Sequence, residues 1–82
     1  MTPEEQYLAL KRNPKGVRFE NLCRTAMAFG FHLRGVKGSH HIFVRDGVRE
    51  LLNFLEVDGM AKPYQVRQFC TMIERYRLLE ER

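Results

Sequence analysis

Three short strands are predicted within residues 31–55, which read FHLRGVKGSHHIFVRDGVRELLNFL. Turn residues divide this stretch twice: Lys37-Gly38 precedes its most apolar part, and Asp46-Gly47 is a pair typical of tight hairpins. β-Branched and aromatic residues are concentrated between the two turns, as they are in strands. Because strands joined by short turns usually pair with each other, we expect an antiparallel sheet. The expected strands are Phe31–Val36, Ser39–Arg45 and Val48–Leu55.

Two longer helices are predicted on either side of these strands. The first covers Arg18–Phe29, and Gly30 is suited to end it in a left-handed conformation. The second begins at Pro63, a residue favoured at the first helical position, and runs to about Leu79. Both carry apolar residues at helical spacing, so each has one face suited to cover a sheet. These residues are Phe19, Leu22, Cys23, Ala26 and Met27 in the first helix, and Tyr64, Val66, Phe69, Cys70, Ile73 and Tyr76 in the second.

A shorter helix is expected at the N-terminus, over residues 2–12. Thr2 and Glu5 have the spacing of a capping box, and Asn13-Pro14 breaks the helix. The order is therefore helix, helix, three antiparallel strands, helix. This is an α+β fold in which the two longer helices cover one face of the sheet and leave the other face open. The chain of 82 residues suffices for one domain with one core.

Charge and hydropathy narrow the classes of function. Lysine and arginine number 14 against 10 acidic residues, and the segment from Lys11 to Arg49 holds nine of these cations against Glu20 and Asp46. A basic middle fits the phosphate backbone of a nucleic acid, and it equally fits an ordinary solvated surface. No segment approaches the roughly 18 apolar residues of a membrane span. The first residues lack the basic start and apolar run of a secretion signal, so we expect a cytoplasmic protein.

The two cysteines, Cys23 and Cys70, fall on apolar positions of the two longer helices. We expect both to be buried small hydrophobic residues rather than a disulfide. Neither CxxC nor HxxxH spacing occurs, so no zinc site is expected, and nothing in the sequence indicates another metal or cofactor. The sequence also lacks the nucleophile elbow, the Walker loop and the dinucleotide-binding glycine motif.

Two adjacent histidines, His40 and His41, stand at the start of the central strand. Successive strand residues point to opposite faces, so one of the two faces the helices and the other faces the open side. The pattern leaves open which is which. Ile42 is on the side of His40, whereas Phe43 is on the side of His41.

The residues around this pair suit an RNA phosphate. Backbone amides of a glycine turn can approach a phosphate, a serine adds a hydroxyl, and lysine or arginine stabilises charge on the phosphorus. A histidine, with its pKa near 6.5, can accept the proton of a ribose 2′-hydroxyl or donate one to the leaving oxygen. The alternative is that both histidines are structural strand residues, as we expect of His32. The expected RNA-binding residues are Arg34, Lys37, Gly38, Ser39, His40 and Arg45.

Two segments resemble the HicA family of mRNA-interferase toxins: residues 37–43, KGSHHIF, and residues 61–69, AKPYQVRQF. The helix before the strands, with the Gly-Phe pair that follows it, is also similar to the family's opening helix. The resemblance covers roughly residues 15–78. It implies one toxin domain over residues 1–82, with its core in residues 15–80 and a fold similar to the double-stranded-RNA-binding domain.

The resemblance also implies an activity and a partner. Members of the family cleave mRNA without a metal, and a HicB antitoxin covers their active site. The second histidine of the family's Gly-Ser-x-His element is catalytic, and His41 occupies that position here. The chain departs from many members after the third strand, where residues 53–59, NFLEVDG, contain neither the usual proline nor a further histidine. We therefore expect His41 to be the general acid or base of an endoribonuclease, with Lys37 and Arg45 positioning phosphate. The alternatives are a non-catalytic RNA-binding module and a protein-interaction domain.

Overall fold

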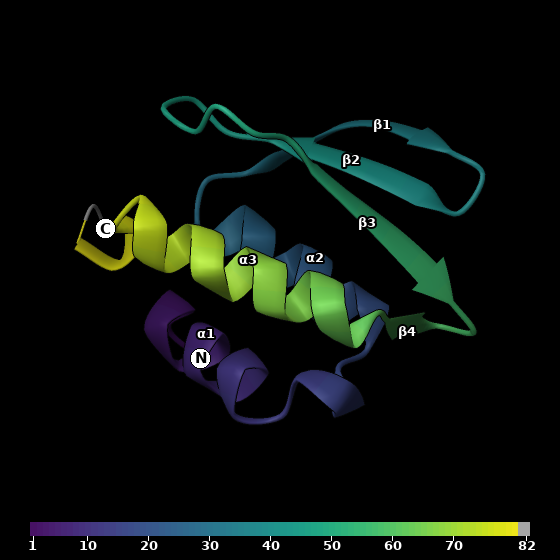
Figure 1. The fold of residues 1–82 in the computed structure, drawn as a ribbon, viewed down its shortest axis with the longest axis horizontal. Helices are drawn as coiled ribbons and strands as arrows, with labels where there is room; N and C mark the ends of the chain where they lie inside the picture. The colour runs from purple at the N-terminus through teal and green to yellow at the C-terminus, as the bar shows by residue number, and fades with distance from the viewer. Residues whose placement is uncertain (81–82) are drawn as a thin grey trace.

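A four-stranded antiparallel sheet forms the upper layer of the molecule in Figure 1. The structure is a computed structural model that describes residues 1–80, so the last two residues of the expected domain lie outside it. The α+β fold expected from the sequence is confirmed, and the strands are adjacent in chain order. They are β1 (His32–Lys37), β2 (His40–Val44), β3 (Leu52–Val57) and β4 (Met60–Ala61).

The fourth strand was not expected, because two residues are too few to show a periodic pattern. β4 pairs with the end of β3 across a turn of two residues, Asp58 and Gly59. Both have positive φ, 52° and 77°, as the tight hairpin turn that favours Asp-Gly requires. At Asp46-Gly47 the predicted turn is present, because the Val48 N–H donates to the Arg45 carbonyl at 3.1 Å. The strands do not pair directly beside it, since the last pair of β2 and β3 is Phe43 with Leu52, so the tight hairpin predicted there is wrong.

The third strand begins at Leu52 rather than at the expected Val48. Contacts with the end of the last helix hold the connection before it. Glu50 accepts hydrogen bonds from the Tyr76 hydroxyl and from Arg75 Nη1, the latter at 3.1 Å. Glu50 is therefore bonded to the end of the last helix, and the residues before Leu52 do not pair with β2.

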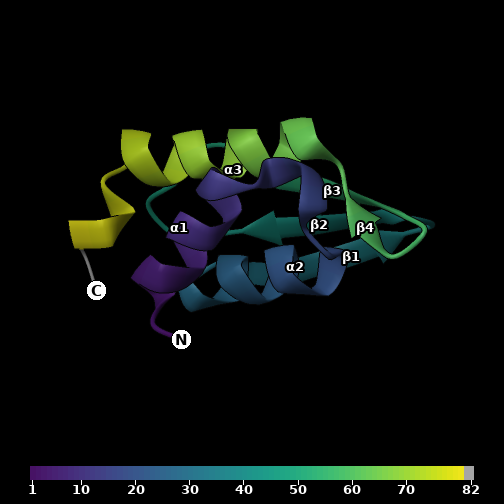
Figure 2. The same ribbon diagram turned by 90° about the horizontal axis from the view of Figure 1, so that it is seen from below.

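The helices form two further layers on one side of the sheet. Figure 2 shows α2 (Phe19–Ala28) along the β1 side and α3 (Pro63–Arg75) along the β3 side, whereas α1 (Pro3–Arg12) packs beneath them. Short 3₁₀ turns follow α1 at Pro14–Gly16 and α3 at Leu78–Glu80. The open sheet face predicted from the sequence is therefore present. No helix within residues 1–80 is long and apolar enough to cross a membrane.

The helix ends follow local signals with one exception. Thr2 and Glu5 form the predicted capping box of α1, and Gly30 follows α2 with a φ of 91°. The last helix ends at Arg75, before the expected Leu79, because Arg77 adopts a left-handed conformation with a φ of 54°. This residue breaks an apolar pattern that continues on both sides of it.

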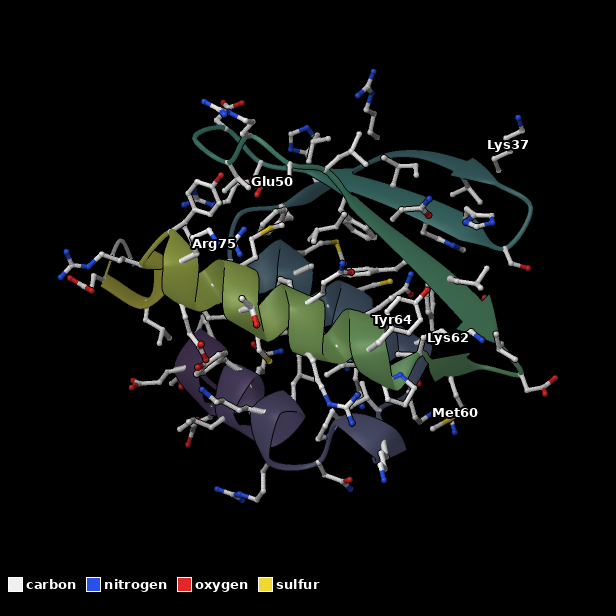
Figure 3. All side chains as sticks on the ribbon, viewed as in Figure 1. Lys37, Glu50, Met60, Lys62, Tyr64 and Arg75 are labelled. Atoms are coloured by element: carbon white, nitrogen blue, oxygen red, sulfur yellow. The ribbon has the colours of Figure 1, made fainter. Side chains whose placement is uncertain are left out.

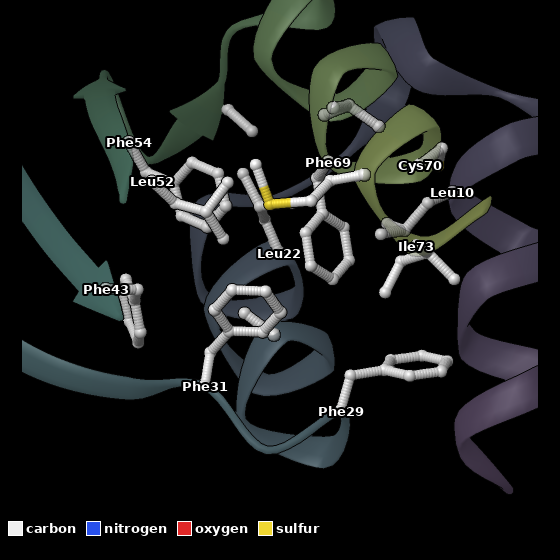
Figure 4. Close-up of a cluster of buried hydrophobic side chains, with 14 of the residues drawn as sticks. Leu10, Leu22, Phe29, Phe31, Phe43, Leu52, Phe54, Phe69, Cys70 and Ile73 are labelled. Atoms are coloured by element: carbon white, nitrogen blue, oxygen red, sulfur yellow. The ribbon is translucent and has the colours of Figure 1, made fainter. Parts of the chain in front are cut away.

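Aromatic rings fill the core between the sheet and the helices (Figure 4). Phe69 of α3 is at its centre, with ring centroids 5.9 Å from Phe31 and 6.0 Å from Phe54. Two residues that we placed on the apolar faces, Met27 and Tyr64, are instead exposed. Both lie near the end of a helix.

One side chain covers the outer edge of β3. Gln65 of α3 is buried, its Oε1 accepts from the Leu55 N–H at 2.8 Å, and its Nε2 donates to the Asn53 carbonyl at 2.7 Å. The amide thus satisfies one donor and one acceptor that a neighbouring strand would otherwise satisfy. This contact ties the start of α3 to the middle of β3.

A polar cluster joins α1 to α3 and gives a prediction for the pH dependence of stability. Glu74 accepts hydrogen bonds from Lys11 Nζ and the Tyr7 hydroxyl, and these bonds lower the pKa of its carboxyl. Because the folded pKa is depressed, the stabilisation is complete above the unfolded value, about 4.3, and is lost as the pH falls through the folded value. We expect the urea midpoint of Glu74→Gln to change less than that of the wild type when the pH falls from about 5 to about 3. Glu56→Gln, a change in an exposed carboxylate outside the cluster, should leave that dependence as in the wild type.

Candidate nucleic-acid site at the start of β2

The structure settles which histidine faces the helices. Phe43 is 2% exposed in the core, so His41, two residues earlier on β2, lies on the helix-facing side. His41 is nevertheless only half-buried, because it stands near the end of the strand where the core opens to solvent. His40 points to the open face and is exposed. The predicted division of the pair between two faces is confirmed.

The His41 ring is held on two sides. Its centroid lies 4.7 Å from that of Phe19, the first residue of α2, in an edge-on arrangement. Its Nδ1 lies 3.3 Å from the Ser39 carbonyl oxygen, which can only accept, so the hydrogen bond requires a proton on Nδ1. In the neutral ring Nε2 then carries the lone pair, and no residue among 1–80 forms a hydrogen bond with it. This tautomer leaves one nitrogen available to take a proton.

The supports of the His41 ring are themselves anchored. The Phe19 N–H donates to the Gly59 carbonyl at 2.9 Å, which fixes the start of α2 against the turn between β3 and β4. The Ser39 carbonyl also accepts from the Glu56 N–H at 3.1 Å. Gly38, with a φ of 61°, makes the two-residue turn that brings Ser39 to this place. Backbone hydrogen bonds therefore fix both residues that contact the ring, Phe19 and Ser39.

His40 belongs to a separate group on the open face. Its Nδ1 lies 3.0 Å from Asn53 Oδ1, and Lys37 is its partner across the β1–β2 ladder. Lys37 and Arg34 line a shallow hollow of about 410 Å³ whose other walls come from apolar residues and a glycine. Those walls are Gly35, Val36, Ile42 and Leu51.

Arg45 lies at the other end of β2. Its Nε donates to the Phe29 carbonyl at 2.7 Å and its Nη1 to the Asp46 carbonyl at 3.0 Å, so it binds the C-terminal end of α2. Arg45 is four positions beyond His41 in the sequence, which corresponds to about 13 Å along a strand. The structure therefore does not bring Arg45 to His41.

Two residues missed by sequence reasoning lie at the His41 end. Phe19 was counted only as a core residue, yet it also contacts the imidazole. Lys62 precedes α3, and Figure 3 shows it at the same end of the molecule as Lys37. The charge at this end is mixed, because Glu56 and Asp58 lie in β3 and the turn after it. Nothing in the local sequence around His41 indicates the Phe19 contact, which joins residues 22 positions apart.

Neither cysteine is poised to act as a nucleophile. Both are free; Cys70 is buried as expected, whereas Cys23 is only half-buried. Burial raises the pKa of each thiol to about 11. At pH 8 only roughly 0.1% of such a thiol is the reactive thiolate. We expect iodoacetamide to alkylate both at least about 100-fold more slowly in the native protein than in urea, as followed by mass spectrometry. Equal rates in the two conditions would contradict the burial.

Within residues 1–80, no three histidine, cysteine, aspartate or glutamate side chains are grouped to hold a metal ion. Comparison of the chain with protein-family models, with curated proteins and with solved structures finds no match.

Proposed function

We propose that this protein is an endoribonuclease that cleaves mRNA without a metal, with His41 as its general base or acid. The observation that carries the proposal is the state of the imidazole. Nδ1 is engaged by the Ser39 carbonyl, Phe19 limits the movement of the ring, and Nε2 is left without a partner among residues 1–80. A histidine held in one tautomer with one free nitrogen is suited to proton transfer at neutral pH.

The reaction is a transfer within the RNA. Nε2 of His41 takes the proton of a ribose 2′-hydroxyl, and the 2′-oxygen bonds to the adjacent phosphorus. The bond from phosphorus to the 5′-oxygen breaks, and that oxygen takes a proton from water. The products are a 2′,3′-cyclic phosphate and a free 5′-hydroxyl. Gly38 and Ser39 form the turn just before His40 and His41, and their backbone amides can bind a phosphate next to the cleaved bond. Lys37 ends β1 on the open face, where it can bind a neighbouring phosphate of the same RNA.

The resemblance to HicA toxins supports a wider role. We propose that the chain acts in the cytoplasm as the toxin of a type II toxin–antitoxin pair and that a HicB-type antitoxin neutralises it. Expression of the chain alone should then arrest growth, and coexpression of the antitoxin should restore it. Unimpaired growth, with the protein present at high level, would contradict the toxin role.

Incubation of the purified protein with a labelled mRNA in EDTA tests the nuclease directly. We expect fragments with 2′,3′-cyclic phosphate and 5′-hydroxyl ends, which can be distinguished by their response to polynucleotide kinase. Intact RNA under conditions where the protein binds it would overturn the proposal.

The second candidate is a non-catalytic RNA-binding module, and the open face favours it. Arg34 and Lys37 stand at a shallow, partly apolar hollow, and no aspartate or glutamate occurs between His32 and Val44. Such a surface binds phosphates with an affinity that falls steeply with salt. Salt-dependent binding without cleavage would establish this second function in place of the first.

A further inference from the structure

The first strand presents a free edge. β1 is the outermost strand, all six of its residues are exposed, and within residues 1–80 only β2 pairs with it. An exposed edge strand offers backbone N–H and C=O groups that another strand can pair with. The other edge of the sheet differs, because β4 and the side chain of Gln65 cover it.

The pairing shows which groups of β1 point outward. In a regular antiparallel sheet, successive residues direct their backbone groups alternately to the two neighbouring strands. In β1 a register shift between Leu33 and Gly35 interrupts this alternation, so the directions are taken from the pairs with β2. The bond from the Glu56 N–H to the Ser39 carbonyl fixes this alternation for β3 and β2. Phe43 and His41 of β2 direct their backbone groups to β3, so they form no backbone hydrogen bonds with β1. The residues opposite them on β1, Leu33 and Val36, therefore direct their backbone groups outward.

The side chains along this edge differ between the two faces. On the helix-facing side, Leu33 is 47% and Val36 53% exposed. The helix α2 runs along the β1 side of the sheet (Figure 2). On the open side, Arg34 and Lys37 line the hollow described above. The β1 edge is therefore apolar on its helix-facing side and cationic on its open side.

We propose that the β1 edge binds an extended segment of a partner protein as an added strand, in which apolar residues alternate with aspartate or glutamate. Alternation places the apolar side chains of the added strand on the side of Leu33 and Val36, and its carboxylates on the side of the two cations. A second copy of this chain fits the edge less well. Edge-to-edge pairing would bring Arg34 and Lys37 of both copies together, and like charges on paired strands repel.

The binding of two synthetic peptides tests this inference, which does not depend on the proposed nuclease activity. One seven-residue peptide alternates valine with glutamate, and the matched peptide alternates valine with lysine. We expect the glutamate peptide to shift the backbone amide resonances of Leu33 and Val36 and to bind about tenfold more tightly than the lysine peptide. Equal affinities, shifts confined to other elements, or stronger shifts of these amides by an RNA oligonucleotide would overturn the proposal. Concentration-dependent shifts of the same amides without peptide would favour a second copy instead.

Two variants locate the contact. Val36→Pro removes an outward N–H and keeps every bond between β1 and β2, so it should weaken the glutamate peptide about tenfold, whereas Val36→Thr keeps the donor and should retain binding. If the proline variant fails to fold, the double variant Arg34→Glu, Lys37→Glu tests the proposal instead. Because its charges are reversed, this variant should bind the lysine peptide more tightly than the glutamate peptide. An unchanged preference in that variant would contradict the proposal.

Discussion

Replacing His41 with alanine should lower the rate of RNA cleavage by about 10²- to 10⁴-fold, the usual contribution of one positioned acid or base. His41→Gln should lose as much, because an amide fills the space and forms hydrogen bonds but does not transfer a proton at neutral pH. Rates are best measured with saturating RNA in EDTA, so that the loss is assigned to the chemical step. A variant that cleaved at the wild-type rate would remove His41 from the mechanism.

The other two histidines provide the controls for this experiment. His32 lies at the far end of β1, opposite Val44, and His32→Ala should cleave at about the wild-type rate. His40 lies next to Lys37 on the open face, so His40→Ala should raise the RNA concentration needed for half-maximal rate and leave the maximal rate nearly unchanged. Loss of the maximal rate in His40→Ala, with His41→Ala active, would move the chemistry to the open face. Thermal unfolding checks that the loss of the Phe19 contact has not unfolded the His41 variants.

Elements with local signals were predicted well, and elements fixed by distant contacts were not. The capping box of Thr2 and Glu5 and the stop at Gly30 depend on neighbouring residues, and both are present. The start of β3 depends on Glu50, whose partners Tyr76 and Arg75 are about 25 residues away. The turn at Asp46-Gly47 follows its local signal and forms, yet Glu50 is bonded to the last helix, and the strand after the turn begins only at Leu52.

The candidate site shows the same division. Strand alternation alone places His40 and His41 on opposite faces, but assigning the faces requires the burial of Phe43. Closeness in sequence also misled the prediction for Arg45. Along a helix, four residues bring side chains together, whereas along a strand they separate them by about 13 Å. Phe19 reaches His41 because the fold brings the first residue of α2 against the start of β2, which no local pattern encodes.

Replacing Gln65 with alanine should strongly destabilise the protein. The change leaves the Leu55 N–H and the Asn53 carbonyl without partners, and each unsatisfied group in a poorly solvated place costs about 1–3 kcal/mol. The expected loss of about 2–6 kcal/mol in the free energy of unfolding is a large share of the roughly 4–12 kcal/mol typical of a chain this long. Gln65→Glu should also destabilise, because a carboxylate can accept from Leu55 but cannot donate to Asn53.

Urea unfolding with an unchanged slope measures this loss, and Gln68→Ala is the matched control. Gln68 is on the same helix and is exposed, so its removal should change the free energy by less than about 0.5 kcal/mol. Equal stabilities of Gln65→Ala and Gln68→Ala would mean that water reaches the β3 edge and replaces the amide. A large difference in stability would mean that the Gln65 amide satisfies the backbone groups at the β3 edge, as a neighbouring strand would. β1 would then be the edge of the sheet at which backbone groups remain available to a partner, because no side chain within residues 1–80 covers them in the same way.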